Sequence, residues 1–322
     1  MRALCIVRLH ATLLLAAVLT AVLTACSGAA PPPPATPASR AASPQMPPLP
    51  PIRHVFVLLL ENQAYAKTFG EQSPAPYLAR TLPSQGVLLS EYYAIGHASL
   101  GNYVALVSGQ APNEDTQLDC ARFSDFRPTS AALDPHGQLP GSGCVYPKTV
   151  PSLPDQLEAA GLSWKAYMED MGKDPARESA TCGHVRVGAL ETTNMASKSD
   201  QYAAKHDPFV YFHSIIDDAA RCNTHVVNLE RLSADLESEA STASYVFITP
   251  NLCSDGHDAP CIDGRPGGLA SIDDFLRTWV PLILHSPAFL KDGLLIVTFD
   301  ESDGAGEEGS SACCAEQPLP GA

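Results

Sequence analysis

Two apolar runs in this chain end directly on oxygen-bearing side chains. The first run, VFVLLL at residues 55–60, is followed by a glutamate and an asparagine, and the second, LLIVTF at residues 294–299, by an aspartate and a glutamate. Uninterrupted apolar runs of this length, bounded by polar residues, indicate buried strands. In α/β proteins the loops at the carboxyl ends of parallel strands carry the functional groups. We therefore expect both ends at one edge of a sheet.

Further apolar runs alternate with helical patterns along the chain. SYVFITP at residues 244–250 predicts another buried strand, whereas Ser152 and Ser271 each precede a helical pattern and are expected to cap it. Alternation of this kind favours parallel strands with covering helices. The predicted fold class is α/β, a mostly parallel sheet with helices on both faces.

The N-terminus has the features of an export signal. Arg2 and Arg8 precede an apolar stretch that is too short for a spanning helix, and this stretch ends on LTAC, which resembles a bacterial lipobox. We expect residues 1–25 to be a lipoprotein signal peptide and Cys26 to be lipidated. A simple cleaved signal peptide is the alternative.

The remaining chain divides into a Pro-rich tether, residues 26–51, and a folded domain, residues 52–322. The expected location is outside the cytoplasm, periplasmic or at the cell surface, with the lipid anchor as the only membrane contact. The chain holds 35 acidic and 20 basic residues. This balance argues against nucleic acid as a partner, because phosphate backbones select basic surfaces. The sequence predicts no oligomeric state.

Eight cysteines follow Cys26, and an even number in an exported chain suggests disulfides. Sequence proximity favours the pairs Cys120–Cys144 and Cys253–Cys261. The first pair would staple a loop insertion rich in Pro and Gly at about residues 110–150. A structural zinc site is not expected, because no C-x-x-C spacing occurs.

The segment GHASLGNYVALVSG contains a candidate nucleophile. Its apolar spacing predicts a helix from near Leu100, which places Ser99 at the helix N-terminus, where backbone N–H groups favour an anion. A serine there either caps the helix or attacks a group that gains negative charge. Gly101 also gives a near match to a nucleophile elbow, but His97 stands where that turn needs a small residue.

Two further segments carry candidate histidines. In PNLCSDGHD, Asp255 and His257 lie two residues apart and can face one metal or one leaving group; a solvated turn is the alternative. His206, in KHDPFVYF, is a second candidate, with a structural role as the alternative.

The carboxyl ends of parallel strands lie at one edge of a sheet, so these candidate residues can converge at a single site. Their combination is stronger evidence for a site than any one motif. Several hard oxygen ligands at one place require a cation to offset their repulsion. An all-oxygen site would prefer Mg, Ca or Mn, and inclusion of His257 would admit Zn or Fe. The expected divalent-metal ligands are Glu61, Asn62, Ser99, Asp255, Asp300 and Glu301.

Six segments in order resemble the bacterial phosphoesterase family of secreted acid phosphatases and phospholipases C, within the alkaline-phosphatase superfamily. They are HVFVLLLEN, HASLGNYVALVSG, YMED, KHDPFVYF, ITPNLCSDGHD and LLIVTFDES, and they extend from about Ile52 to Gly304. The resemblance implies an alkaline-phosphatase-like sheet and a phosphate-ester substrate. It also implies metal binding by the acid and amide groups at the two strand ends.

The resemblance assigns roles to individual residues. Ser99 would become phosphorylated, Asn102 would steady the transferring phosphoryl group, and Asp255 and His257 would supply metal ligands or a proton donor. His97 and His206 would face the substrate. Two departures stand out: Gly101 replaces a usual proline, and the family's elements after the Asp-Glu strand are lacking, so we expect the chain to be truncated at its C-terminus.

The expected function is metal-dependent hydrolysis of phosphoric monoesters through a phosphoserine. Three alternatives remain open: a phospholipase C-type phosphodiesterase, a metal-independent serine esterase that uses Ser99, Asp255 and His257, and a surface protein without turnover.

Overall fold

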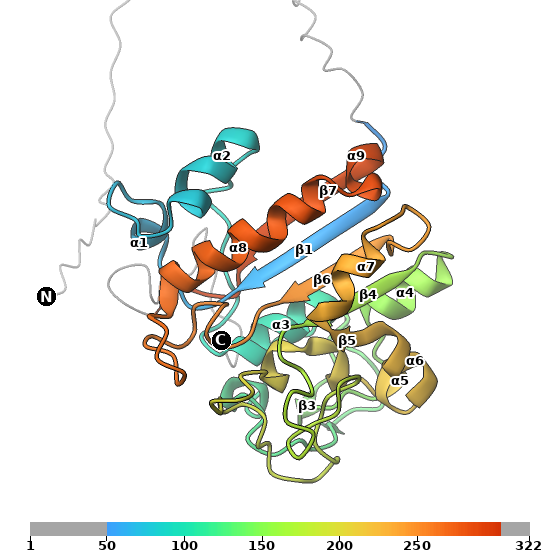
Figure 1. Ribbon diagram of the computed structural model, residues 1–322. Helices are drawn as coiled ribbons and strands as arrows, with labels where there is room; N and C mark the ends of the chain where they lie inside the picture. The colour runs from blue at the N-terminus through green and yellow to red at the C-terminus, as the bar shows by residue number, and fades with distance from the viewer. Residues whose placement is uncertain (1–49, 304–322) are drawn as a thin grey trace, which may run out of the picture. The chain divides into compact units, whose positions relative to one another are not determined.

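The computed structural model describes residues 50–303. The expected signal peptide, the lipidation site Cys26 and nearly all of the tether lie outside this part, as do Cys313 and Cys314. A five-stranded sheet, in which every pairing is parallel, has the order β5-β4-β6-β1-β7 (Figure 1). Its strands are β1 (His54–Leu60), β4 (Trp164–Met168), β5 (Val226–Asn228), β6 (Tyr245–Thr249) and β7 (Gly293–Phe299). The α/β prediction is confirmed.

The register of β1 with its neighbours decides which strand ends meet. β1 pairs with β6 on one side and, along its whole length, with β7 on the other, so Leu60 lies opposite Phe299. The backbone N–H of Asp300 donates to the carbonyl of Leu60 at 3.0 Å. The first residues after β1 and β7 are thereby placed side by side.

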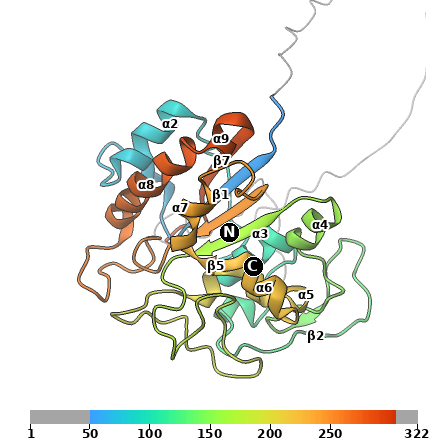
Figure 2. The ribbon, with the colours of Figure 1, turned by 45° about the vertical axis from the view of Figure 1, so that its right-hand side comes forward.

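Helices lie on both faces of the sheet (Figures 1 and 2). The α-helices are α1 (Tyr65–Phe69), α2 (Leu82–Gln85), α3 (Ser99–Ser108), α4 (Leu153–Ala159), α5 (His213–Ile216), α6 (Ala219–His225), α7 (Leu232–Asp235), α8 (Gly268–Leu284) and α9 (Pro287–Asp292). Short turns of other helical type are η1 (Tyr77–Thr81), η2 (Thr116–Leu118), η3 (Ala204–His206), η4 (Pro208–Tyr211) and η5 (Leu229–Arg231).

Alternate residues of β1 enter two separate cores. Val57 and Leu59 pack with α3 and with the aromatic residues of η4 and its neighbours. Phe56 and Leu58 pack with the apolar stripe of α8. A strand that is apolar on both faces is what a sheet covered on both sides requires, and this explains the uninterrupted run at residues 55–60.

The predicted elements are present, with two corrections. Ser152 caps α4 in a capping box, as predicted. α8, however, begins at Gly268, not after Ser271, which is buried inside the helix. The reason is Gly267, whose φ of 69° starts the helix early. A Cβ there would lie 1.8 Å from the carbonyl oxygen of Asp258, so only glycine fits.

The second correction concerns burial of the last strand. Within residues 50–303, β7 is the edge strand of the sheet, and the side chains of Leu294 and Ile296 are 38% and 40% exposed. An edge strand has a neighbour on one side only, so this strand is less covered than the predicted buried strand.

Three disulfides join cysteines within the described residues. Cys120–Cys144 and Cys253–Cys261 confirm the predicted pairs, and the first does staple the loop region that contains the small ribbon of β2 (Arg127–Pro128) and β3 (Gly141–Ser142). Cys182–Cys222, separated by 40 residues, was not predicted. No helix among residues 50–303 is long and apolar enough to cross a membrane.

Candidate active site

The carboxyl ends of β1, β6 and β7 and the start of α3 meet at one edge of the sheet (Figure 1). Glu61 follows β1 directly, Asp300 follows β7 directly, and Ser99 is the first residue of α3. Asp255 lies in the loop after β6, and its carbonyl accepts a 2.9 Å hydrogen bond from the N–H of Glu61. The four expected groups are therefore neighbours, although they span 240 residues of sequence.

The carboxylate of Glu61 is fully buried at the centre of the site. Its Oε2 accepts a 2.9 Å hydrogen bond from Ser99 Oγ, and its Oε1 accepts one of 2.5 Å from the Tyr103 hydroxyl. Burial raises the pKa of Glu61 well above its usual range, and the charges of Asp300 and Asp255 add to the shift.

His206 joins Glu61 to Asp255. Its Nδ1 lies 3.0 Å from Asp255 Oδ2 and its Nε2 lies 3.3 Å from Glu61 Oε1, while its ring stacks on Tyr103 with centroids 5.2 Å apart. Burial lowers the pKa of His206 well below its usual range, and Lys205 and His257 contribute. This shift favours the neutral imidazole, which is the form that ligates metals.

Asp300 and Glu301 have different surroundings. Asp300 Oδ1 accepts from the backbone N–H groups of Asn62 at 3.2 Å and Glu301 at 2.7 Å. Glu301 Oε2 accepts from Asn102 Nδ2 at 2.9 Å. Burial, together with the charges of Asp300 and Asp119, raises the pKa of Glu301 to about 8.

Lys205 places a buried ammonium group at the site. Its ammonium lies 3.1 Å from Asp119 Oδ2 and 3.0 Å from His257 Nε2. Burial opposes a charge here, but Asp119 and Glu61 outweigh it and raise the pKa of Lys205. Because a protonated lysine only donates, His257 Nε2 accepts, and its Nδ1 donates to Asp258 Oδ1 at 2.8 Å.

An open cavity of about 430 Å³ lies over this edge. Most of its lining side chains are polar or charged. The lining residues are Asn62, Gln63, Lys67, His97, Gly256, His257, Ala259, Glu301, Ser302 and Asp303.

The site has the chemistry of a divalent-metal site. Glu61, His206 and Asp255 offer ligand atoms that all lie within 4.8 Å of one another. Among the described residues, two buried atoms of this site make no hydrogen bond: Asp300 Oδ2 and His206 Nε2, although the latter lies 3.3 Å from Glu61 Oε1. Glu61, Asp255 and Asp300 are buried together and repel one another when ionised, and a cation would offset that repulsion. The residues present fit a metal ion.

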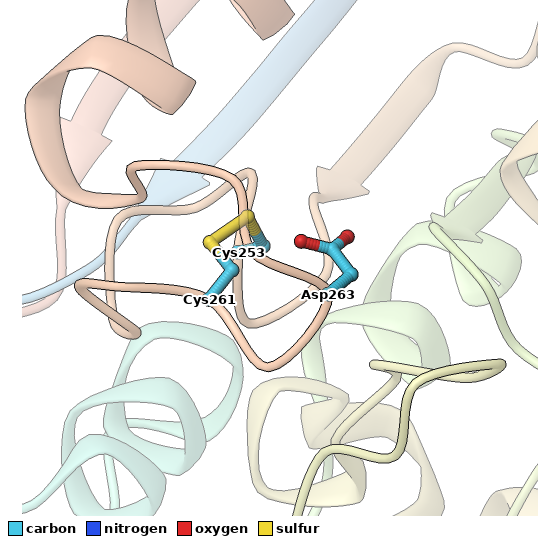
Figure 3. A group of neighbouring side chains, drawn as sticks. All are labelled: Cys253, Cys261 and Asp263. Atoms are coloured by element: carbon cyan, nitrogen blue, oxygen red, sulfur yellow. A yellow bond between two sulfur atoms is a disulfide. The ribbon is translucent and has the colours of Figure 1, made fainter.

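A second group with metal-ligand side chains lies in the loop after β6. It comprises Cys253, Cys261 and Asp263 (Figure 3). The two sulfur atoms are bonded to each other, so neither is a thiolate, the form that binds a metal. This group is a brace for the loop that carries Asp255.

The structure divides the predicted ligands into two sets. Glu61, Asp255 and Asp300 are buried together at the strand ends, and Ser99 adjoins them. Asn62 and Glu301 line the cavity instead, as does His97. Asn102 lies between the two sets, since its amide bonds Glu301 and its Oδ1 accepts from the N–H groups of the loop before α3.

Three placements were not foreseen. His206, expected at the substrate, is buried behind the cavity against Glu61 and Asp255. Tyr103 and Lys205 carried no predicted role. The sequence indicates these two residues only through their closeness to predicted site residues: Tyr103 is four residues after Ser99, and Lys205 directly precedes His206.

The Phosphoesterase family model matches residues 75–306, which include Ser99, Asp255 and Asp300 but not Glu61. The chain is 26% identical to a probable acid phosphatase of Kluyveromyces lactis over 79% of its own length and 48% of that protein. It is 28% identical to a phosphate-repressible acid phosphatase of Penicillium chrysogenum, over 69% of the chain and 42% of that protein.

A bacterial relative is a phosphatidylinositol-3-phosphatase of Mycobacterium tuberculosis, 24% identical over 80% of the chain and 66% of that protein. The chain spans about half the length of the fungal relatives it matches.

Proposed function

Because the chain belongs to the Phosphoesterase family, we propose that it is a metal-dependent phosphoric ester hydrolase, a phosphomonoesterase of the acid-phosphatase type that acts through a phosphoserine at Ser99. The observation that carries the proposal is the 2.9 Å hydrogen bond from Ser99 Oγ to Glu61 inside a cluster of buried acids. The relatives named as acid phosphatases support the same reaction class.

The metal would be held by Glu61, Asp255 and Asp300, with His206 as the nitrogen ligand. When bound, a divalent cation supplies positive charge to a phosphoryl group and to the oxygen that attacks it. A ligand set with one imidazole admits Zn or Fe beside Mg, Ca and Mn.

The residues around Ser99 organise its attack. Glu61 Oε2 accepts from Ser99 Oγ, so it orients the hydroxyl and lies where the proton would go. As the bond from Oγ to phosphorus forms, the bond from phosphorus to the alcohol oxygen breaks. In the second stage, water attacks the phosphorus of the phosphoserine, the Oγ–P bond breaks, and the proton returns from Glu61 to Oγ.

The departing alcohol needs a proton, and Lys205 and His257 are placed to give it. His257 lines the cavity and is bonded to the Lys205 ammonium behind it. We assign the proton to this pair, not to His257 alone, because the lysine is the charged member. The pair would recover the proton from the attacking water.

A small, polar alcohol suits the cavity best. Its lining is mostly amide, imidazole, ammonium and carboxylate groups, which favour hydrogen-bonding leaving groups over acyl chains. The relatives named as phosphatases agree with a monoester. A phospholipase C-type action on diesters is the less favoured alternative.

The esterase triad does not match the geometry. Ser99 donates to Glu61, Asp255 is bonded to His206, and the ring of His257 is engaged by Lys205 and Asp258. A triad requires a histidine that accepts from the serine.

Release of phosphate from an aryl phosphate tests the proposal. We expect turnover that is lost with a chelator, restored by divalent metal, and lost in Ser99→Ala. Ser108→Ala, at the last residue of the same helix, is the control and should keep wild-type activity, since Ser108 bonds only within its own segment. Turnover that survives both the chelator and Ser99→Ala would disprove the mechanism. If the wild type binds metal but hydrolyses no phosphate ester, the result would favour a surface protein without turnover.

We also propose export and lipidation at Cys26. The three disulfides support an oxidising compartment. In a bacterial host, the full chain should fractionate with membranes and Cys26→Ser should not. Release of wild-type protein in soluble form would favour the simple signal peptide instead.

A further inference from the structure

Glu169 and Asp170 directly follow β4, the strand that pairs with β6 on the side away from β1. They end the segment YMED and do not line the cavity. Asp170 is nevertheless buried and Glu169 half-buried, at the same edge of the sheet as the proposed metal ligands. Their position raises the question of what two acids do beside the loop that carries Asp255.

Both acids hold one residue of that loop, Asn251. Asp170 Oδ2 accepts from Asn251 Nδ2 at 2.7 Å, and Glu169 Oε2 accepts from the Asn251 N–H at 2.9 Å. Lys173 lies 2.5 Å from the other oxygen of Asp170, so the carboxylate is paired on both sides. Charge-assisted hydrogen bonds of this kind are stronger than neutral ones.

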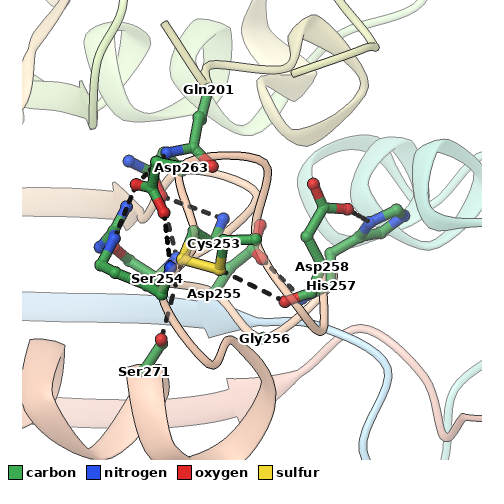
Figure 4. The surroundings of a disulfide bond; sticks show 12 residues. Gln201, Cys253, Ser254, Asp255, Gly256, His257, Asp258, Asp263 and Ser271 are labelled. Carbon is green, nitrogen blue, oxygen red and sulfur yellow. Dashed lines mark hydrogen bonds and ion pairs between the residues drawn. A yellow bond between two sulfur atoms is a disulfide. The ribbon is translucent and has the colours of Figure 1, made fainter. Parts of the chain in front are cut away.

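Asn251 passes this constraint on to Asp255. Its Oδ1 accepts from the N–H groups of Cys253 at 3.1 Å and Ser254 at 2.9 Å, and its backbone carbonyl accepts from the N–H of Asp255 at 2.8 Å. The side chain is thus fixed at its amide nitrogen by Asp170 and closes the turn with its amide oxygen. Figure 4 shows the turn, with Ser254, Asp255 and Gly256 beside the disulfide.

The far side of the turn is tied to β1. Besides the bond from Glu61 to the carbonyl of Asp255, Gln63 Nε2 donates to the carbonyl of Gly256 at 3.2 Å. The loop after β6 is therefore held between the ends of its two neighbouring strands. Removal of one tie should let the Asp255 carboxylate move relative to Glu61 and His206.

We propose that Asp170 is a positioning residue that acts through Asn251 to set the Asp255 carboxylate against His206 and Glu61. The inference rests on the proposed function, since it takes Asp255 as a metal ligand. Outer partners of metal ligands typically change affinity by about 10- to 100-fold, and we expect that range for Asp170.

The test is a double-mutant cycle with Asp170→Asn and Asn251→Ala on the full chain, with calorimetric titration of Mn²⁺ into metal-free protein. Each single variant should weaken Mn²⁺ binding by about 10-fold or more. The double variant should be no weaker than the worse single one, because the two residues act in series. Urea unfolding of each variant reports stability separately.

Asp273→Asn is the matched control. Asp273 is also buried, accepts from two backbone N–H groups, those of Tyr77 and Leu78, and pairs with Arg277 on its own helix. It should lose stability as Asp170→Asn does but bind Mn²⁺ within about twofold of wild type, since it has no tie to the loop of Asp255.

Equal Mn²⁺ affinity in Asp170→Asn and Asp273→Asn would overturn the inference, and so would strictly additive losses in the cycle. A wild type that hydrolyses no phosphate ester but shows the affinity difference would reject the proposed function and keep this inference. If the wild type hydrolyses a phosphate ester but Asp170→Asn and Asp273→Asn bind Mn²⁺ equally well, the proposed function stands and this inference is rejected. A wild type that binds no divalent metal would reject both.

Discussion

Ser99 Oγ and Glu61 Oε2 lie 2.9 Å apart, joined by a hydrogen bond across 38 residues of sequence. The contact exists because β1 ends at Leu60 and α3 begins at Ser99 on the same edge of the sheet. Tyr103, one helical turn after Ser99, bonds the other oxygen of the same carboxylate. The first turn of α3 therefore fixes both the hydroxyl and the acid that receives its hydrogen bond.

Glu61→Gln should separate stability from activity. The amide still accepts from Ser99 but has no charge for a metal. The fall in kcat/KM for an aryl phosphate should therefore exceed the loss of about 10- to 100-fold that is typical of losing an outer partner of a ligand. Burial raises the pKa of Glu61, so its ionised form costs the folded state free energy. With chelator at pH 8, the variant should unfold at higher urea than wild type. If Glu61→Gln kept the kcat/KM of the wild type, Glu61 would have no role in catalysis or metal binding.

Tyr103→Phe tests the second bond to Glu61. The ring and its stacking on His206 remain, and only the hydroxyl is lost. We expect kcat/KM to fall by about 10-fold. Tyr211→Phe is the control, because the Tyr211 hydroxyl is fully buried and has no hydrogen-bond partner among residues 50–303. That variant should keep full activity and gain stability. Similar activity in the two variants would show that the hydroxyl of Tyr103 has no role.

The strands of the site were predictable because their signal is local. An uninterrupted apolar run such as residues 55–60 can be buried in few ways, and its polar end is visible in the sequence. The same holds for Ser152, whose capping box lies within four residues. The start of α8 was not predictable in this way, since Gly267 is required by its approach to Asp258, in the loop before the helix.

The inner members of the site depend on tertiary contacts. Tyr103 occupies an apolar position of α3, and nothing in the helix pattern shows that its hydroxyl meets Glu61. Asp119 and Glu61 lie beside Lys205 and raise its pKa against the effect of burial, and neither contact is visible in the sequence. Cys182–Cys222 closes a loop of 40 residues, for which sequence proximity gives no guide.

Glu178, which does not line the cavity, should make the free energy of unfolding depend on pH. Burial, with Asp200 beside it, raises the pKa of Glu178 to about 8. A carboxyl whose pKa is raised on folding binds more protons in the folded state, so stability falls as pH rises from about 4.5 to 8. Urea midpoints at pH 5 and pH 8 should differ less in Glu178→Gln than in wild type. If the difference between the two urea midpoints were the same in Glu178→Gln as in wild type, ionisation of Glu178 would not destabilise the folded state.

Of two disulfides, Cys120–Cys144 should contribute more to stability and Cys253–Cys261 more to activity. Chain entropy predicts that loss of Cys120–Cys144, which closes 24 residues, costs about 3 to 4 kcal/mol, and loss of Cys253–Cys261, which closes 8, about 2 to 3 kcal/mol. The second pair, however, braces the loop that carries Asp255 and His257. Paired Cys→Ser variants should therefore show the larger loss of stability for the first bridge and the larger loss of kcat/KM for the second. If the variant with the larger loss of stability also showed the larger loss of kcat/KM, Cys253–Cys261 would matter only for folding.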